Sequence, residues 1–404
     1  MCNFVNKIII ILSFILILPA NGQKLNETYL QAKADMFRER YAEAGQKILS
    51  IPVEERTSQM YHTLGESFYQ TGNYVVAANF FTTSDSLKTN TEAILNAARS
   101  FAMMQQPDKA AEWLQKYLSQ RDKLSEAELN LDPAFAKIEH SRDWKTLWNK
   151  EWYNTAERKT AEAAILLKRK RYTEALGIID TEIANSSSSV RFYALRAKVY
   201  EAMEQYDPAH ESAQAAIRLR NNNPEYFTDA ARLAIQVKKY DVALDNINMA
   251  IRLDPYQLEL YLQRAAILRL TNRYNEARND LNFYFTYFPA DPKALYQMGL
   301  NETEAGNPLA GIDYFTMLID NDQTSPEYYI ARANAGIKAN NYSLAGYDLA
   351  QALDLKPSIS EAWHKKGIVL QQENKLEDAC YYWKTALDMG NREAAEYIYI
   401  YCKK

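Results

Sequence analysis

A regular spacing of about 34 residues between small side chains is the feature that most restricts how this chain can fold. Six equal intervals separate Ala163, Ala197, Ala231, Ala265, Gly299, Ala333 and Gly367. Upstream, slightly shorter intervals separate Ala32, Gly65 and Ala98, and nearly two intervals then lead to Ala163. Self-similarity at such a period indicates an array of stacked supersecondary units, each of which buries its apolar face against its neighbours.

Each unit is predicted to be a helical hairpin. A large residue such as Phe68, Tyr200 or Leu268 follows the small anchor by three positions, so both lie on one face of a first helix. Nine positions after the anchor, just past a short polar turn, comes an aromatic residue in seven units: Tyr41, Tyr74, Tyr172, Tyr206, Tyr240, Tyr274 and Tyr342. The second helix then buries a stripe at i, i+4 and i+7, as in Ala243, Ile247 and Ala250.

In these features the chain resembles the tetratricopeptide repeat family, whose unit has the same length and the same small, bulky, aromatic and small positions. The resemblance extends over about ten units from Leu25 to Met389. It implies an all-α fold, an α-solenoid in which helical hairpins wind into a right-handed superhelix. Some units depart from the pattern, because Pro107, Pro308 and Leu376 occupy the usual Tyr position.

The N-terminus differs from the rest of the chain. Lys7 is its one charge before Lys24, and an almost wholly apolar run from Ile8 to Leu18 is followed by Pro19 and small residues. This pattern is typical of a secretory signal peptide, cleaved at about residue 22, and the run is shorter than the ~20 apolar residues of a membrane span. A retained membrane anchor is the alternative. A signal peptide that ends before Gln23 resembles those of many exported Bacteroidota proteins. We therefore expect a periplasmic or secreted protein, soluble and without a stable membrane span after cleavage.

The repeats suggest five segments. They are a signal peptide (1–22), an N-terminal module of about three repeats (23–123), a degenerate junction (124–155), an array of seven repeats (156–389) and a C-terminal capping helix (390–404). In the junction, a longer helix capped by Asp143 is expected to carry Trp144, Trp148 and Trp152 on one face. These three residues pack the junction or form an exposed aromatic platform for a ligand.

The family resemblance implies a concave wall lined by first-helix side chains. It selects positions six and three before the anchor, and one, four and five after it. The residues we expect to bind a peptide there are Arg191, Lys198, Glu201, Arg232, Gln236, Arg269, Tyr296, Asn334, Lys338 and His364. Both signs of charge together with Tyr suit a protein or peptide surface. With a net charge of −4, the chain lacks the basic excess of a nucleic-acid-binding protein.

The sequence has no recognisable catalytic or metal-binding pattern. The four His residues, His62, His140, His210 and His364, are scattered and have no metal-ligand spacing. No Gly-rich phosphate loop and no G-x-S-x-G elbow occurs. We therefore expect no enzymatic activity, no metal and no cofactor.

The two cysteines beyond the predicted signal peptide suggest a disulfide. A last repeat helix from about Leu376 to Asp388 and a return helix from Arg392 would place Cys380 and Cys402 nearly level on antiparallel neighbours. An oxidising compartment then favours a disulfide, and two free thiols are the alternative. The same return helix is expected to cap the solenoid.

Together these features predict a non-enzymatic scaffold of the periplasm or cell envelope that binds a protein or peptide in its concave groove. The alternative is an accessory component of glycan uptake or secretion at the outer membrane.

Overall fold

The computed structural model describes residues 26–185 and 189–402, so the predicted signal peptide at 1–22 lies outside the described residues. Within the described part the chain is all-α, with 23 α-helices, two short 3-10 helices and no strand. This confirms the predicted fold class. No helix in this part is both long enough and apolar enough to span a membrane.

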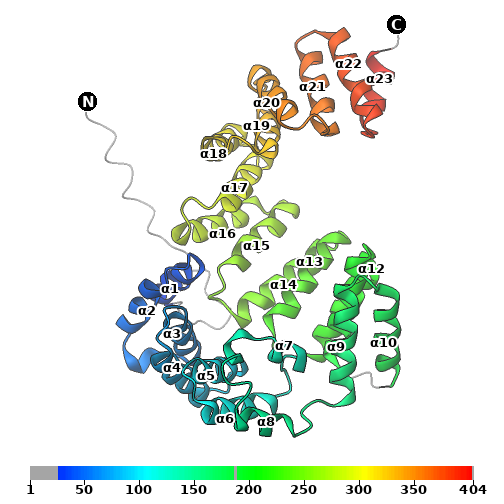
Figure 1. Cartoon of the computed structure of the whole chain (residues 1–404). Helices are drawn as coiled ribbons and strands as arrows, with labels where there is room; N and C mark the ends of the chain where they lie inside the picture. The colour runs from blue at the N-terminus through cyan, green and yellow to red at the C-terminus, as the bar shows by residue number, and fades with distance from the viewer. Residues whose placement is uncertain (1–25, 186–188, 403–404) are drawn as a thin grey trace, which may run out of the picture. The chain divides into compact units, whose positions relative to one another are not determined.

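Ten of the helix pairs are consecutive antiparallel hairpins (Figure 1). Their bounds are α1 (Glu27–Phe37) and α2 (Tyr41–Ser50), α3 (Ser58–Gln70) and α4 (Tyr74–Leu87), α5 (Thr91–Met103) and α6 (Pro107–Leu118), α9 (Thr155–Lys168) and α10 (Tyr172–Asn185), α11 (Val190–Ala202) and α12 (Tyr206–Leu219), α13 (Pro224–Gln236) and α14 (Tyr240–Leu253), α15 (Glu259–Leu270) and α16 (Tyr274–Tyr287), α17 (Pro292–Glu304) and α18 (Pro308–Asn321), α19 (Pro326–Lys338) and α20 (Tyr342–Leu355), and α21 (Ser360–Gln372) and α22 (Leu376–Asp388).

Every second helix of a hairpin begins at the position that the repeat predicts. The repeated Tyr is the first residue of seven of these helices, and the anchors such as Ala265 are buried where the helices meet. Pro107 and Pro308 replace Tyr without breaking α6 and α18, since the first helical position needs no backbone donor. The departures from the pattern are therefore compatible with the fold.

The turn within each hairpin depends on one residue in the left-handed conformation, two positions before the second helix. Lys238 has φ 57° at this position, and Gly72 has φ 81°. The Lys238 N–H donates to the Ile235 carbonyl at 2.9 Å and the Lys239 N–H to the Ala234 carbonyl at 2.8 Å. These two bonds close the end of the first helix, as in a Schellman motif.

The chain divides into two compact units. Unit 1 comprises the described part of Met1–Lys239 together with Asp245–Leu258, and unit 2 comprises Tyr240–Leu244 and the described part of Glu259–Lys404. The five segments expected from the sequence were defined by the regularity of the repeats. Their boundaries stay a prediction.

Between α6 and α9 the repeat gives way to α7 (Glu126–Asn130), a 3-10 turn at Pro133–Phe135 and α8 (Arg142–Trp148). The expected long helix with three Trp residues is wrong, because α8 is capped by Ser141 and ends at Trp148. Trp152 lies beyond it and donates its indole N–H to the Leu147 carbonyl at 2.8 Å. Trp144 is buried, and Trp148 and Trp152 pack against the same core. The three residues pack the junction and form no exposed platform.

In unit 1, the first hairpin contacts the segment that follows the last hairpin. The Tyr256 ring contacts the Tyr29 ring edge-on, with centroids 4.7 Å apart, and its hydroxyl accepts from the Asn26 N–H at 3.4 Å. The Gln59 side chain donates to Asp254 Oδ1 at 3.1 Å. Tyr256 packs against the apolar cluster of the first two hairpins. The helices of unit 1 therefore form a ring that this contact closes.

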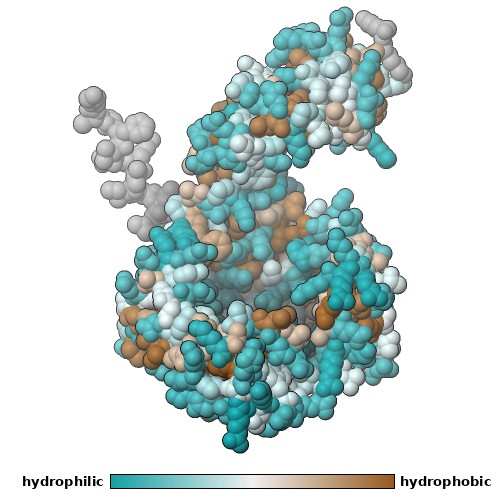
Figure 2. All heavy atoms as spheres, viewed as in Figure 1, coloured by the Kyte–Doolittle hydropathy of each residue, from teal (hydrophilic) through white to brown (hydrophobic). Residues whose placement is uncertain are grey.

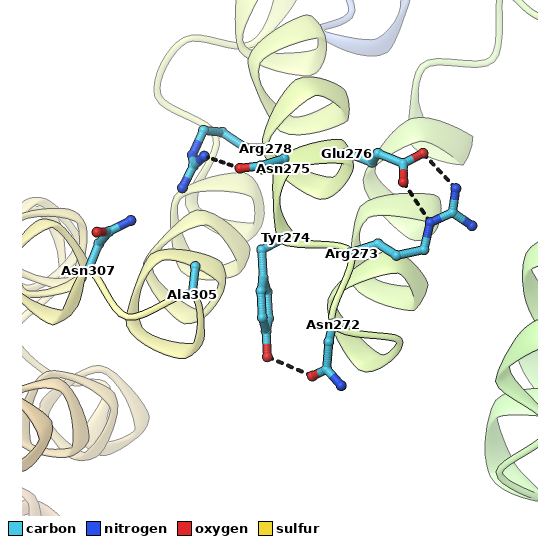
Figure 3. Close-up of a pocket in the computed structure, with 8 residues that line it drawn as sticks. All are labelled: Asn272, Arg273, Tyr274, Asn275, Glu276, Arg278, Ala305 and Asn307. Carbon is cyan, nitrogen blue, oxygen red and sulfur yellow. Dashed lines mark hydrogen bonds and ion pairs between the residues drawn. The ribbon is translucent and has the colours of Figure 1, made fainter.

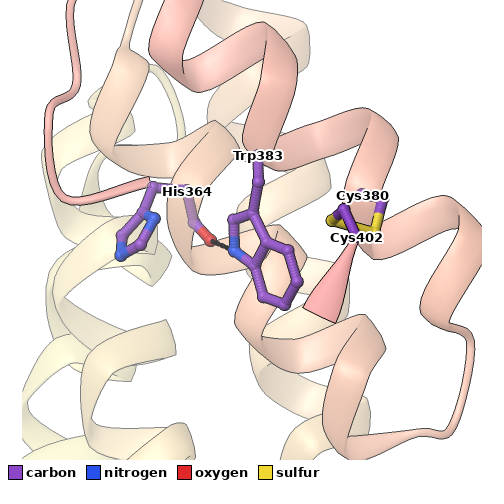
Figure 4. Close-up of a disulfide and its surroundings, with 4 residues drawn as sticks. All are labelled: His364, Cys380, Trp383 and Cys402. Atoms are coloured by element: carbon purple, nitrogen blue, oxygen red, sulfur yellow. Dashed lines mark hydrogen bonds between the residues drawn. A yellow bond between two sulfur atoms is a disulfide. The ribbon is translucent and has the colours of Figure 1, made fainter. Parts of the chain in front are cut away.

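Unit 2 ends in α22 and a short helix, α23 (Ala394–Tyr401). Cys380 on α22 and Cys402, just after α23, form a disulfide with their Cα atoms 5.7 Å apart (Figure 4). Trp383, which is fully buried, packs against Tyr397 of α23 and donates to the His364 carbonyl at 3.1 Å. The disulfide therefore fastens α23 over the last hairpin.

Candidate binding grooves

The inner side of unit 1 is hollowed, and the hollow has a volume of about 1050 Å³ (Figure 2). Its walls are mainly first helices, namely α3, α5, α9, α11 and α13, and α7 with the chain before it completes them. First-helix side chains face the hollow because the second helices cover the other side of each hairpin. We call this space the unit 1 groove.

The segment before α7 is fixed to the wall of the unit 1 groove by polar contacts. Lys123 Nζ lies 3.0 Å from Glu157 Oε1, and both side chains are largely buried. The Tyr153 hydroxyl donates to the Leu124 carbonyl at 2.8 Å, and the Leu124 N–H donates to the Tyr117 hydroxyl at 2.7 Å. Burial raises the pKa values of both phenols, so each stays neutral and can keep its hydrogen bond. These contacts hold the segment in place, so it forms part of the groove wall.

Arg191, one of the predicted groove residues, belongs to this support. It donates to the Arg121 carbonyl at 2.5 Å and approaches Asp122 Oδ1 to 3.4 Å. Arg220 also pairs with Asp122. Arg191, six positions before its anchor, therefore reaches the groove, as the family resemblance implies. Its charge, however, is paired with groups of the same chain.

Leu131, which follows α7, is the most exposed large apolar side chain in the described part of the chain. It is 82% exposed and lines the unit 1 groove together with Leu95 and Ile165, of which Ile165 is 43% exposed. An isolated Leu at a surface is ordinary, but this one lies within a hollow, which makes Leu131 a candidate binding residue.

The remaining predicted residues of unit 1 lie on first helices outside this hollow. Lys198 and Gln236 are exposed on α11 and α13. Glu201 on α11 pairs with Arg232 on α13, and Arg232 also contacts Asp229 at 3.0 Å. These two predicted groove residues are thus brought together as an ion pair between neighbouring repeats.

Unit 2 has a smaller groove of about 320 Å³ between α17, α19 and α21. Asn334 and Lys338 line it, beside the apolar side chains of Leu300, Ile337 and Ile368. Arg269 does not line this groove, and its guanidinium lies 2.5 Å from Glu304 Oε1. We call this space the unit 2 groove.

Tyr296 and His364 are less accessible than expected. Tyr296 is half-buried and its ring packs against Phe315 and Tyr328. His364 is only 4% exposed, because α23 lies over it and the Tyr397 ring of that helix is 5.0 Å away. Burial lowers the pKa of the imidazole. His364 is therefore covered by the capping helix and does not line a groove. The same repeat position is also buried at His62, Leu95 and Ile330.

A third hollow, of about 360 Å³, lies at the hairpin turns of unit 2 (Figure 3). Its charged side chains already have partners within the chain. Arg273 forms two bonds to Glu276, at 2.7 and 2.6 Å, and Arg278 forms two bonds to Glu302, at 2.6 and 2.8 Å. We assign no binding role to this hollow.

Several lining residues of the unit 1 groove were not predicted. The periodic rule would have found Glu66, Glu92 and Lys168, which lie one after, six before and five after an anchor. Leu131 and Arg169 have no such position, and Ile165 is two after its anchor. The degenerate repeat hides Leu131 in particular.

Comparison with known proteins supports the repeat assignment. A family model described as a tetratricopeptide repeat matches residues 190–223, the hairpin of α11 and α12. No curated protein sequence matches the chain. A solved tetratricopeptide repeat protein from Parabacteroides merdae is 17% identical, with a TM-score of 0.55, over 61% of this chain and 98% of that one.

Two further solved structures are similar at lower TM-scores. The C-terminal part of a repeat-containing protein from Cytophaga hutchinsonii is 18% identical over 59% of this chain and 98% of that one, with a TM-score of 0.43. Yeast Tom70 is 13% identical over 92% of this chain and 93% of that one, with a TM-score of 0.40.

Proposed function

Since this chain is a solenoid of tetratricopeptide repeats, we propose that it is a non-enzymatic scaffold of the cell envelope that binds segments of other proteins in its concave grooves. One observation carries the proposal, namely that Leu131 is 82% exposed inside a hollow of about 1050 Å³. Burying a Leu side chain fully would stabilise a complex by about 1.5–3 kcal/mol. A partner with an apolar side chain can supply that burial.

Two features support a location in the envelope. The N-terminal sequence has the charged start, short apolar run and small residues of a secretory signal peptide. The Cys380–Cys402 disulfide suits an oxidising compartment, where such bonds form and persist. In this proposal the mature protein begins near Gln23 and works in the periplasm or outside the cell.

The mixture of charged and apolar side chains in both grooves supports a protein ligand. In the unit 2 groove, Lys338 and Asn334 can bind carboxylates and backbone carbonyls, while Leu300, Ile337 and Ile368 contact apolar side chains. In the unit 1 groove, Leu131 and Ile165 can contact apolar side chains of the ligand. Binding interfaces commonly join such an apolar centre to a polar rim.

Photo-crosslinking in living cells tests the proposal. A photoreactive amino acid is placed at Ile165 or at Ile337, one in each groove. Matched controls are Val75 on α4 and Leu309 on α18, which are 60% and 69% exposed and lie on second helices outside both grooves. We expect a defined envelope protein to crosslink to the groove positions and not to the controls.

Two outcomes would contradict this function. Crosslinks formed only at Val75 or Leu309 would move the binding surface to the second helices. No protein crosslink at any position, combined with binding of oligosaccharides by the purified chain, would favour an accessory role in glycan uptake instead.

A further inference from the structure

We propose that three aromatic rings in the last hairpin of unit 2, those of Trp363, Tyr381 and Tyr382, form a binding site for an arginine side chain of a partner protein. We call these residues the aromatic triad. None of the three lines the unit 1 groove or the unit 2 groove. The inference therefore goes beyond the proposed function and adds a contact surface on α21 and α22, near the C-terminus in Figure 1.

The rings of the aromatic triad contact one another. Between centroids, the Trp363 ring lies 5.0 Å from the Tyr382 ring and 6.3 Å from the Tyr381 ring. The Tyr381 and Tyr382 rings are 5.6 Å apart, and their planes differ by 89°. The planes of Trp363 and Tyr382 differ by only 35°, whereas those of Trp363 and Tyr381 differ by 73°. The Tyr381 ring therefore stands at a steep angle to the other two, and the triad forms a corner rather than a flat stack.

Two rings of the triad are fixed to the core, and the third is exposed. Trp363 and Tyr382 pack against the apolar cluster around Trp383. The Trp363 indole N–H also donates to the Pro357 carbonyl at 2.8 Å. Tyr381 does not belong to that cluster and is 62% exposed. A ring with this exposure presents a face to solvent, and the negative face of an aromatic ring attracts cations.

The fold itself does not require an aromatic residue at Tyr381. Asp313 occupies the same position in α18, five residues after the first residue of the helix. In α20 the position is Tyr347, which is 59% exposed and has no ring contact in the described part of the chain. Only Tyr381 combines this exposure with two neighbouring rings among these three helices, which points to binding rather than to packing.

Two carboxylates without a partner lie beside the aromatic triad. Asp378 is three residues before Tyr381 and four before Tyr382, on the same side of α22. Burial raises the pKa of the Tyr382 hydroxyl, and the charges of Asp378 and Asp354 raise it further, so both carboxylates act on that ring. Among residues 26–185 and 189–402, neither carboxylate has an ion pair or a side-chain hydrogen bond.

The cations in this region leave the two carboxylates unneutralised. Lys375, on which Asp378 also acts, pairs with Glu373 at 2.7 Å. Lys384 is the one cation in the sequence of α22, and it lies six residues from Asp378, about 9 Å along the helix axis. Asp354 is in the last turn of α20, where the helix dipole disfavours an anion. A bound cation would offset this negative charge.

Arginine suits this surface better than lysine does. Its planar guanidinium can stack on an aromatic face while its N–H groups bind a carboxylate. Tyr381 offers the ring, and Asp378, one turn earlier on α22, offers the carboxylate. The ammonium of lysine is more strongly hydrated and forms no such planar stack. We therefore expect the site to prefer arginine to lysine, and lysine to a neutral side chain.

Three synthetic peptides of equal length test this order. Each has a fluorescent label and three copies of one residue separated by glycines. That residue is arginine, lysine or citrulline, which has the shape of arginine without its charge. By fluorescence anisotropy with the full mature chain at low salt, where exposed charges are least screened, we expect the arginine peptide to bind about threefold more tightly than the lysine peptide and about tenfold more tightly than the citrulline peptide.

Substitutions in α22 assign the binding to the aromatic triad. Tyr381→Leu keeps an apolar side chain but removes the ring, and should weaken binding of the arginine peptide about three- to fivefold. Asp378→Asn should weaken it by a similar factor, and Lys384→Gln, which removes a repelling charge, should strengthen it about twofold. The matched control is Tyr347→Leu, at the same repeat position, which should bind as the wild type does. Circular dichroism should show that all variants keep their helices.

The inference is overturned if the arginine peptide does not bind, if the citrulline peptide binds equally well, or if Tyr381→Leu has no more effect than Tyr347→Leu. These results are distinguishable from a failure of the proposed function. Crosslinking of a natural partner at Ile165 or Ile337 does not involve the aromatic triad. Those crosslinks would uphold the grooves even where the peptides fail, and their absence would leave the arginine site standing if the peptides bind as expected.

Discussion

Arg332 and Asp348 form two hydrogen bonds, of 2.9 and 2.8 Å, between the first and second helices of one hairpin. The Asp348 side chain is fully buried. Arg264 and Asp280 form the same arrangement two repeats earlier in the chain, with bonds of 2.7 and 2.6 Å. Burial raises the pKa of Asp348, and the guanidinium of Arg332 opposes that rise. The pair therefore keeps a buried carboxylate compatible with a folded hairpin.

Replacing Arg332 with Met should destabilise the hairpin of α19 and α20 by about 3–5 kcal/mol at neutral pH, because Asp348 stays buried without its partner. The loss should be smaller at low pH. Without Arg332 nothing lowers the raised pKa of Asp348, so the folded form holds its proton more strongly than the unfolded form, and stability is gained as the pH falls below that pKa. Urea unfolding from about pH 8 to about pH 5 checks this sign.

The matched control for this experiment is Arg332→Met combined with Asp348→Leu. It removes both charges and should recover most of the stability at neutral pH. An equal deficit of the single variant at both pH values would contradict the role given to Asp348.

Replacing Lys238 with Gly should stabilise unit 1 by about 1 kcal/mol, because a side chain in the left-handed conformation is strained and Gly is not. Lys198→Gly is the control. It lies within α11, where Gly should instead destabilise by about 1 kcal/mol. Chemical denaturation of the three proteins gives both signs, and a destabilised Lys238→Gly variant would mean that the lysine side chain makes a stabilising contact.

Replacing Cys402 with Ser should destabilise the end of unit 2 by roughly 3 kcal/mol, since the disulfide closes a loop across 22 residues. Hydrogen exchange should rise in α22 and α23 and stay unchanged in unit 1. Wild-type protein treated with a reductant should behave as the variant does. A non-reducing peptide map in which Cys380 and Cys402 carry free thiols would rule out this account.

Replacing Tyr256 with Ala should weaken the closure of unit 1 by about 2 kcal/mol, which combines the lost ring pair with Tyr29 and lost apolar burial. Hydrogen exchange of α1 should increase although the substitution is far away in the sequence. Tyr347→Ala, at a Tyr that is 59% exposed, is the control and should leave exchange unchanged. Unaltered exchange of α1 in the Tyr256→Ala variant would show that the contact contributes no stability.

Much of the fold could be predicted because the repeat encodes local contacts. The small anchors, the Tyr at the start of each second helix and the bounds of α22 at Leu376 and Asp388 all follow from residues close together in sequence. The junction could not be predicted in this way. Helix α8 ends at Trp148 because the chain turns there toward the Asn154 cap of α9, and Trp152 bonds back to Leu147.

The site was harder to predict because it depends on contacts between distant parts of the chain. Arg191 occupies a groove position, but the segment at Arg121 and Asp122, which joins α6 to α7, takes up its charge. His364 follows the same rule and is covered by α23. Leu131 falls where the anchor of the degenerate repeat would lie, 33 residues after Ala98, and anchors are buried, so periodicity gives no reason to choose it as a groove residue.

The contact between Tyr29 and Tyr256 also changes the topology of unit 1. In a linear array each end has one neighbour, so unfolding can start by fraying at either end. In a ring no hairpin is terminal. Whichever hairpin unfolds first must therefore lose its interfaces with both neighbouring hairpins at once. Asn26 and Tyr256 are 230 residues apart in the sequence. The segment that contains Tyr256 thus serves as the second neighbour of the hairpin of α1 and α2. Truncation after Lys239 would therefore create two loose ends, one of them at the start of the chain.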